Sequence, residues 1–358
     1  MATTEAPTAP AQPARPRAND AVRDFVSKYG LIALLAALPV FYGVSDLLGD
    51  QGNLSRLGEN IVRGLSNGTI WALIAVGYTL VYGIIELINF AHGDVFMLGS
   101  FSAFGLFGTL GLTLATGVVG VFFGLLIILV VTMLVCGTLN VMIEKVAYRP
   151  LRNAPKLAPL ITAVGFSFIL QNVGLLWRGG SPRSVTDLIR AQQEVFTVVG
   201  VVFTRADLIA FAVTIPLVLG LIAFITKSKM GKAMRATAQD PDAARLMGIN
   251  VDTTISLTFL LGGMLAGAAG LIYALYQTTV WFFQGFQAGL IAFTAAVMGG
   301  IGNIKGAVLG GLIIGIIQEL SDNRIGAQWT AAVVFGYLVL IMVFRPQGLI
   351  GEQTREAG

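Results

Sequence analysis

The sequence has few of the residues on which soluble domains and catalytic sites depend. Charged residues make up 12% of the 358, about half of the roughly 25% typical of a soluble domain. The chain has one cysteine, Cys136, and one histidine, His92, so a disulfide framework is excluded and a Cys-rich or multi-histidine metal site is not expected. No Ser-His-Asp, paired-carboxylate or metal-ligand pattern is present, and we therefore expect no enzyme, no catalytic residues and no metal.

A nucleotide-binding loop is also absent, since no Gly-rich segment ends in Gly-Lys-Ser/Thr. We therefore expect no cofactor on this chain, and any ATP must be used by partner subunits. The net charge of +4 comes from few residues and fits Lys and Arg at the cytosolic ends of membrane spans, so nucleic acid is not an expected partner.

Apolar residues are what the chain has in abundance. They form 55% of the sequence, the mean hydropathy is +0.79, and apolar runs of about 20 residues, long enough to cross a bilayer, recur along it. Because lipid offers no partner for backbone amides, continuous apolar runs predict helices, and the expected fold is an all-α, polytopic transmembrane bundle. About ten spans are predicted: 29–48, 61–85, 93–112, 116–143, 157–177, 206–226, 253–276, 287–301, 305–320 and 328–344.

The predicted organisation has four parts. Residues 1–28 are rich in Ala, Pro and Thr and form a disordered cytosolic tail; 29–55 add an N-terminal helix, read as a retained signal anchor, and a loop. Residues 56–350 are the transmembrane domain, and 351–358 a cytosolic tail. If the spans alternate in direction, all seven lysines fall on the cytosolic side of a bacterial plasma membrane. Both termini are then expected in the cytosol. Four arginines in the longest outer loop contradict this bias: Arg178, Arg183, Arg190 and Arg205.

Glycines recur at every fourth position in the apolar segments. Gly302, Gly306 and Gly310 form one such row, and Gly263 with Gly267 another. This spacing lets helix backbones approach closely in a membrane. Tight packing of a large bundle and helices that slide during transport both need it, so the pattern leaves the two open. The short segments 157–177 and 287–301 are candidates for broken or re-entrant helices.

The polar segment 227–252 predicts a short helix outside the bilayer. Asp240 suits its N-cap, Pro241 its first position and Gly248 its C-terminal cap. The helical period gathers small and apolar residues on one face: Ala243, Ala244, Leu246 and Met247. Such a face either lies on the membrane surface or inserts into a groove of a cytosolic partner.

Polar residues within the apolar segments are candidates for a pathway or gate. Asn89, His92 and Asp94 cluster where the second span meets the third, at the expected cytosolic boundary. A structural or gating network and a proton relay are both open for them. Gln171 and Asn172 lie deeper, in the fifth span, where neutral amides either join helices or line a pathway.

Four motifs resemble those of the branched-chain amino acid ABC transporter permeases. They are the early Asn89-Phe-Ala-His-Gly-Asp94, the basic Tyr148-Arg-Pro-Leu-Arg152, the loop from Gly231 to Asn250, and the late Gly-rich segment from Gly299 to Gly310. The likeness covers roughly residues 60–350. The chain is similar to the shorter of the two permease types, except in its first 55 or so residues.

The resemblance implies a type II-like importer in which the loop around Asp240 couples this chain to ATPases. The implied partners are two ATP-binding cassette subunits, a second related permease and an extracytoplasmic solute-binding protein, besides the lipid bilayer. Branched-chain amino acids are the expected substrates, and a urea or short-chain amide importer is the alternative within the class. An ion-coupled secondary transporter or channel is the alternative of another class, although ionisable residues near the bilayer midplane are scarce.

Overall fold

The computed structural model describes residues 30, 35–48, 54–152, 154–155 and 157–350. The predicted tails 1–28 and 351–358 therefore lie outside the described residues. Most of the described chain is helical. The long helices are α2 (Ser55–Ile85), α3 (His92–Thr109), α4 (Val118–Ile143), α5 (Leu157–Arg178), α6 (Arg205–Lys227), α9 (Val251–Gln277), α10 (Gln284–Gly299), α11 (Ile304–Arg324) and α12 (Thr330–Phe344).

Within the described residues, seven helices are long and apolar enough to cross a membrane. They are α2, α4 with the π and 3-10 turns Glu144–Tyr148 and Arg149–Leu151, α5, α6, α9, α11, and α12 with the preceding 3-10 turn Ala327–Trp329. The other three predicted spans form helices that are shorter or less apolar: Leu35–Leu48, α3 and α10. Segment 157–177, a candidate broken helix, is instead one continuous helix, α5.

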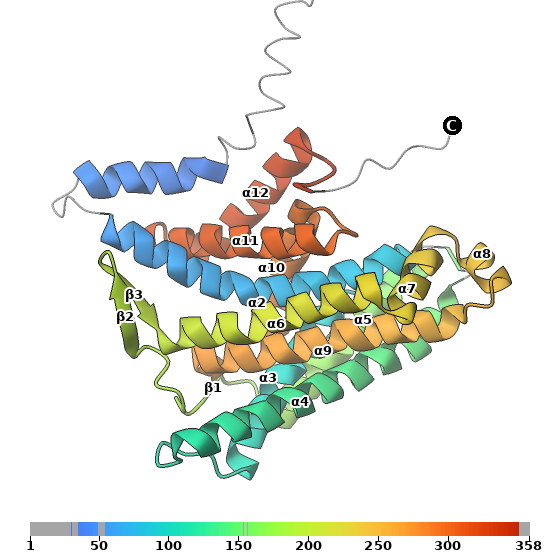
Figure 1. Cartoon of the computed structure of the whole chain (residues 1–358), viewed down its shortest axis with the longest axis horizontal. Helices are drawn as coiled ribbons and strands as arrows, with labels where there is room; N and C mark the ends of the chain where they lie inside the picture. The colour runs from blue at the N-terminus through green and yellow to red at the C-terminus, as the bar shows by residue number, and fades with distance from the viewer. Residues whose placement is uncertain (1–29, 31–34, 49–53, 153, 156, 351–358) are drawn as a thin grey trace, which may run out of the picture.

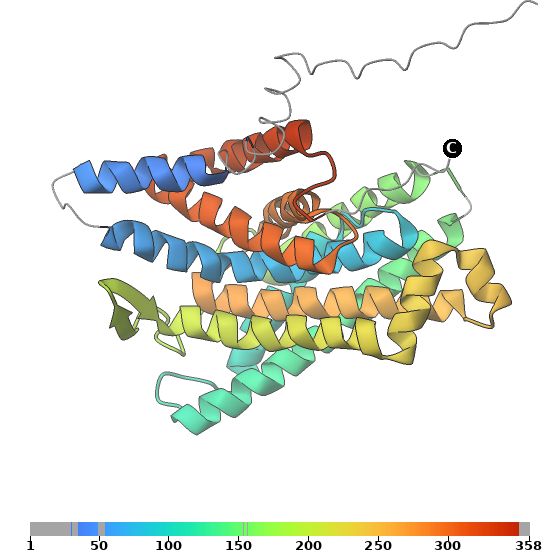
Figure 2. The same ribbon diagram turned by 45° about the horizontal axis from the view of Figure 1, so that its top comes forward.

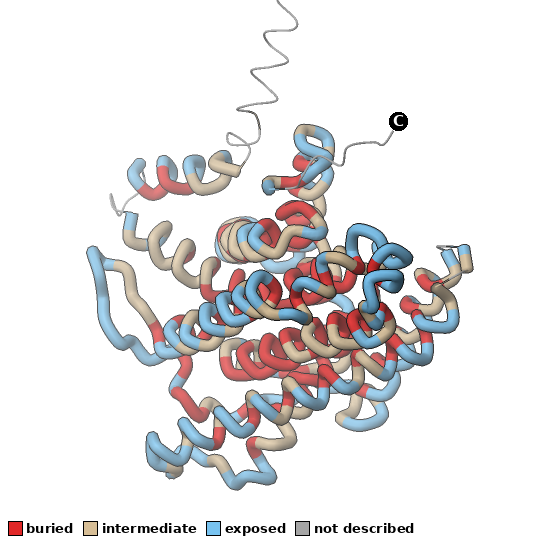
Figure 3. Tube along the Cα trace, turned by 45° about the vertical axis from the view of Figure 1, so that its right-hand side comes forward, coloured by how far each residue is buried: buried red, intermediate tan, exposed pale blue. Residues whose placement is uncertain are grey.

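The bundle has an inner and an outer set of helices (Figures 1 and 3). Helices α2 and α9 run through the middle and are largely buried, whereas most residues in the apolar stretches of α4, α5, α6 and α12 are at least partly exposed. Such an exposed apolar surface suits contact with lipid tails, which are as apolar as leucine.

Glycines set the closest contacts between the inner helices. A Cβ atom at Gly64 would lie 2.7 Å from the Ile316 Cα, and one at Gly68 2.8 Å from the Leu312 Cα, so α2 and α11 touch backbone to backbone. Helix α9 meets α4 in the same way, because a Cβ at Gly263 would lie 2.9 Å from the Gly137 Cα. Larger residues at these positions would push the helices apart.

The two ends of the bundle differ (Figures 1 and 2). One end holds a hairpin of β2 (Glu194–Val198) and β3 (Val201–Thr204), with the small pair β1 (Arg183–Ser184) and β4 (Thr279–Val280). These strands correct the all-α prediction. The other end holds two short helices, α7 (Lys229–Gln239) and α8 (Pro241–Leu246).

The predicted N-terminal addition packs on the rest of the chain. Helix Leu35–Leu48 runs beside α11 and α12 in Figure 2. Asp46 and Arg324 form an ion pair in which both side chains are largely buried. The Arg324 guanidinium also lies 5.1 Å from the centre of the Tyr42 ring. These contacts attach the helix to the bundle through groups that are costly to separate.

Candidate functional site

The segment that links α2 to α3 folds back into the bundle. His92 is fully buried, and its ring lies 4.9 Å from that of Tyr78 and against Gly77. Gly77 lies eight residues before the end of α2, a depth of about 12 Å. The motif therefore lies inside the protein and is not solvated at its surface, while its level in the membrane stays a prediction. The non-helical backbone before α3 is tolerated because the protein surrounds it.

Asp94 is the centre of a buried polar cluster between α3 and α5. Its Oδ2 accepts a hydrogen bond from the Ser167 hydroxyl at 2.5 Å, and the Gln171 amide donates to the Ser167 oxygen at 3.1 Å. The other carboxylate oxygen, Oδ1, is buried without a hydrogen-bond partner among the described residues. The cluster thus keeps a free acceptor inside the bundle.

The two predicted amides of α5 have different surroundings. Gln171 joins the Asp94 cluster, whereas Asn172 is exposed and its amide donates to its own helix at the Phe168 carbonyl, 2.8 Å away. Asn172 therefore does not join the buried cluster, because its helix turns it toward the outer surface of this chain. A pathway role of either amide stays a prediction.

A small cavity lies beside the cluster, where α3 and α10 approach through glycines. Its volume is about 40 Å³, and Tyr78, Ser167, Phe286 and Gly289 are among the residues that line it. A Cβ at Gly285 would lie 2.8 Å from the Asp94 Oδ1. The space suits a water molecule and not a leucine, so the bundle is closed here.

Asn89 belongs to a second buried network that joins α4 to α9. Its amide donates to the Asn140 Oδ1 at 3.0 Å, and the Asn140 amide donates to the Phe259 carbonyl at 2.6 Å. The Tyr148 hydroxyl donates to the Ile88 carbonyl at 3.1 Å. Every link satisfies a buried polar group, which favours the structural reading for Asn89.

A charged network closes the same end of α4. Arg152 pairs with the fully buried Glu144 and, at 2.5 Å, with Asp252. The Ser256 hydroxyl also donates to Glu144, at 2.7 Å, and Arg149 reaches Asp252 from the exposed side. Burial of Glu144 is thus compensated by an opposite charge and a hydroxyl.

Helix α8 has the predicted caps. The Asp240 Oδ1 accepts hydrogen bonds from the backbone amides of Asp242 and Ala243 at 2.9 and 3.0 Å, and Gly248 adopts a φ of +80°. The predicted contact face is divided, however. Ala244 is buried within the chain, whereas Leu246 and Met247 are 89% and 82% exposed. A partner would meet these two side chains and Ala243, which is also exposed.

The predicted glycines of the late segment also have two roles. Gly306 and Gly310 face the backbone of α10 at Gly299 and Ala295, as helix contacts do. Gly302 lies in the turn between α10 and α11 with φ +94° and open space where a Cβ would be. The prediction that Gly302 continues the packing row was wrong, because its turn requires a left-handed backbone.

Sequence reasoning missed three residues that the fold brings to these sites. Tyr78 and Ser167 line the cavity, and Glu144 anchors the charged network. One signal was present for Ser167, which lies four residues before Gln171 and so on the same face of α5. Tyr78 lies on α2, far in the sequence from Ser167. Glu144 is only eight residues from Arg152, but its other partner, Ser256, is 112 residues away.

A multi-pass helical bundle with a closed polar interior and a capped helix exposed at one end has the organisation of a transporter permease. The sequence profile of the family described as "Branched-chain amino acid transport system / permease component" matches residues 60–343. The chain belongs to this family. It is therefore a transporter permease subunit and not an enzyme.

Two relatives extend over most of the chain. The high-affinity branched-chain amino acid transport permease BraD of Pseudomonas aeruginosa is 40% identical over 303 residues, which cover 83% of this chain and 97% of that protein. The corresponding LivH permease of Escherichia coli is 38% identical, with coverage of 83% and 96%. The fructose import permease FrcC of Rhizobium meliloti is 28% identical over about half of each chain. No solved structure matches.

Proposed function

We propose that this chain carries branched-chain amino acids across the bacterial inner membrane as the permease subunit of an ATP-driven importer. One observation supports the substrate above all: two relatives that match over most of the chain, at 40% and 38% identity, are named as permeases for these amino acids. The seven apolar helices make it a multi-pass membrane protein. We retain about ten crossings, a type II-like arrangement and cytosolic termini as parts of the proposal.

In this proposal the energy enters at α8. Two ATP-binding cassette subunits bind the exposed end that holds Leu246 and Met247, a second related permease completes the pathway, and an extracytoplasmic binding protein delivers the substrate. The Asp240 cap holds α8 as a rigid element. A rigid, apolar tip is suited to insertion into a groove of a partner.

The proposed pathway passes the Asp94 cluster. The free Oδ1 of Asp94 is an acceptor suited to the ammonium group of an amino acid. Because the cavity there is closed, access must alternate through movement at the glycine contacts of α3 and α10. Weak contacts suffice, since a tightly held substrate would leave slowly.

The assembled transporter in vesicles tests the proposal through ATP-dependent leucine uptake. Met247→Asp places a charge at the tip of α8 and should lower both ATPase binding and uptake at least about tenfold, as for a central interface residue. Gln239→Glu, at an exposed position of α7, is the matched control and should leave both unchanged. Concentrative uptake by this chain without any ATPase would instead support an ion-coupled transporter.

A second measurement decides the substrate within the class. Unlabelled isoleucine and valine should compete with leucine uptake, whereas urea and acetamide should not. Inhibition by urea or acetamide alone would favour the amide importer.

A further inference from the structure

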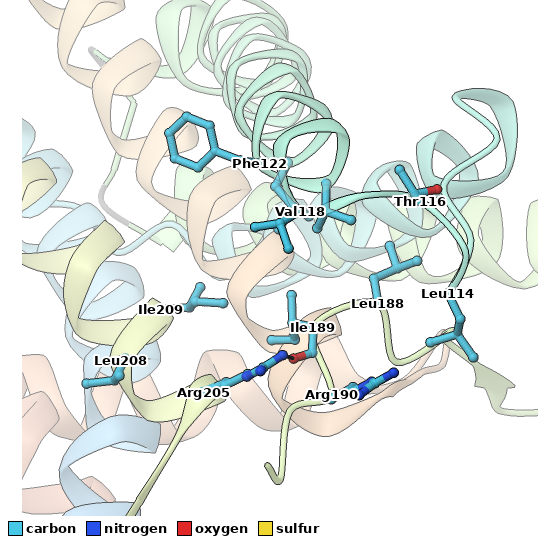
Figure 4. Close-up of a pocket in the computed structure, with 12 residues that line it drawn as sticks. Leu114, Thr116, Val118, Phe122, Leu188, Ile189, Arg190, Arg205, Leu208 and Ile209 are labelled. Atoms are coloured by element: carbon cyan, nitrogen blue, oxygen red, sulfur yellow. Dashed lines mark hydrogen bonds between the residues drawn. The ribbon is translucent and has the colours of Figure 1, made fainter. Parts of the chain in front are cut away.

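An apolar groove outside the proposed pathway lies at the hairpin end of the bundle. It has a volume of about 590 Å³ and lies between the first turns of α4 and α6, above the loop that precedes β2. Figure 4 shows Phe122 and Val118 on one side, Leu188 and Ile189 in the centre, and Arg190 with Arg205 along the opposite edge. Contact with lipid tails requires only apolar side chains, so the two arginines at the rim of the groove need another explanation.

The level of the groove follows from the helices that form it. Val118 and Arg205 are the first residues of two candidate spans, so the groove lies where hydrocarbon gives way to headgroups. Its apolar wall opens sideways, since Val118 is 86% and Phe122 62% exposed. Acyl chains can therefore enter it directly from the bilayer.

Neither arginine of the rim is neutralised by a carboxylate in the described part of the chain. The Arg205 guanidinium makes one long hydrogen bond, to the Ile189 carbonyl at 3.4 Å, and retains other N–H donors. Arg190 is presented by a tight turn in which the Asp187 carboxylate accepts the Ala191 amide at 2.7 Å. The other two arginines of this loop differ, because Arg178 stacks on Trp177 and Arg183 donates to the Arg178 carbonyl.

We propose that this groove binds a phospholipid with an anionic headgroup, its phosphate held by Arg190 and Arg205 and an acyl chain lying along α4 and α6. Arginine suits phosphate because its planar fork donates two hydrogen bonds at once. Arg190 and Arg205 lie at the end of the bundle opposite the lysine-rich α7, although basic residues are usually concentrated on the cytosolic side. Binding of a lipid phosphate would explain arginines at this end. It is independent of the substrate and of the ATPases.

Photo-crosslinking of the assembled transporter tests the site. The transporter is placed in phosphatidylcholine nanodiscs with a minor fraction of phosphatidylglycerol that carries a diazirine on one acyl chain, and the labelled peptides are mapped. Label should appear on the first turns of α4 and α6. Labelling there should fall about fivefold for Arg190→Gln or Arg205→Gln and about 25-fold for the double variant. Arg183→Gln, in the same loop but outside the groove, should leave labelling unchanged.

Four outcomes would overturn the proposal. Equal labelling by a phosphatidylcholine probe would show that the groove does not prefer an anionic headgroup, and loss of labelling on addition of inorganic phosphate would show a site for free anions. Label in the isolated chain but not in the assembled transporter would assign the groove to the second permease. Unchanged labelling in the double variant, with an unchanged melting temperature, would show that the two arginines do not bind the lipid.

Discussion

In soluble proteins the most apolar segments are the most buried, and the inner and outer helices of this bundle show the reverse. In the most apolar stretch of α2, 78% of the residues are buried, whereas only 17% are buried in that of α4, whose stretch is the most apolar among the seven candidate spans. The buried helices carry the glycines and polar residues, and the exposed ones carry leucine, valine and phenylalanine.

The difference shows what holds a bundle together in lipid. Burying a leucine gains little when the alternative environment is equally apolar. Close backbone contact between glycines and hydrogen bonds between polar groups therefore have to supply the specificity. Paired substitutions that change the same residue type in an inner and an outer position test this account.

The largest effect is expected at the charged network of α4. Arg152→Ala leaves the fully buried Glu144 without its cationic partner, which should cost about 3–5 kcal/mol of unfolding free energy. Arg149→Ala breaks a pair whose side chains are 47% and 42% exposed, and should cost less than about 1 kcal/mol. Thermal unfolding in detergent measures both. Equal losses would show that burial of the network does not matter.

Glycine replacement should have the next largest effect. Gly315→Val in α11 forces a side chain into the backbone of Gly64 and Gly68 and should destabilise the fold by about 3 kcal/mol. Gly336→Val in α12 is the matched control, since a Cβ there meets none of the described residues within 4 Å. Unfolding and membrane yield measure the difference. A variant of Gly315 as stable as that of Gly336 would contradict the backbone contact of α2 and α11.

The smallest effect on stability is expected in α5. Gln171→Ala removes a buried amide that donates to Ser167 on the same helix and so supports the Asp94 cluster, which should cost about 1 kcal/mol, the usual net value of a hydrogen bond. Asn172→Ala, one residue further on the exposed face, should cost nothing measurable.

Leucine uptake separates a pathway role from a merely structural one. If the cluster lines the pathway, Gln171→Ala lowers uptake in transporters that remain folded and bound to their ATPases, while Asn172→Ala does not. Equal uptake by both variants would leave the cluster only a packing role.

Several features of this protein follow from its sequence alone. Scarce charge and long apolar runs determine a multi-pass helical protein, because unpaired backbone amides are not tolerated in lipid. The caps of α8 at Asp240 and Gly248 were also predictable, since the interactions that make them span only a few residues. Ordered motifs along residues 60–350 were sufficient to predict the family.

Tertiary structure alone decided how deep and against what each polar residue lies. Local sequence placed His92 and Asp94 at the membrane boundary, but the turn after α2 carries them into the interior, to partners on α2 and α5. Tertiary structure also gives neighbouring residues different surroundings. Gln171 joins a buried cluster and Asn172 is exposed, and Gly306 packs on α10 whereas Gly302 lies in a turn. Apolar periodicity is weak in helices that are hydrophobic on all sides, so the sequence does not predict which face of a helix packs against the rest of the bundle. The contacts with distant helices determine it.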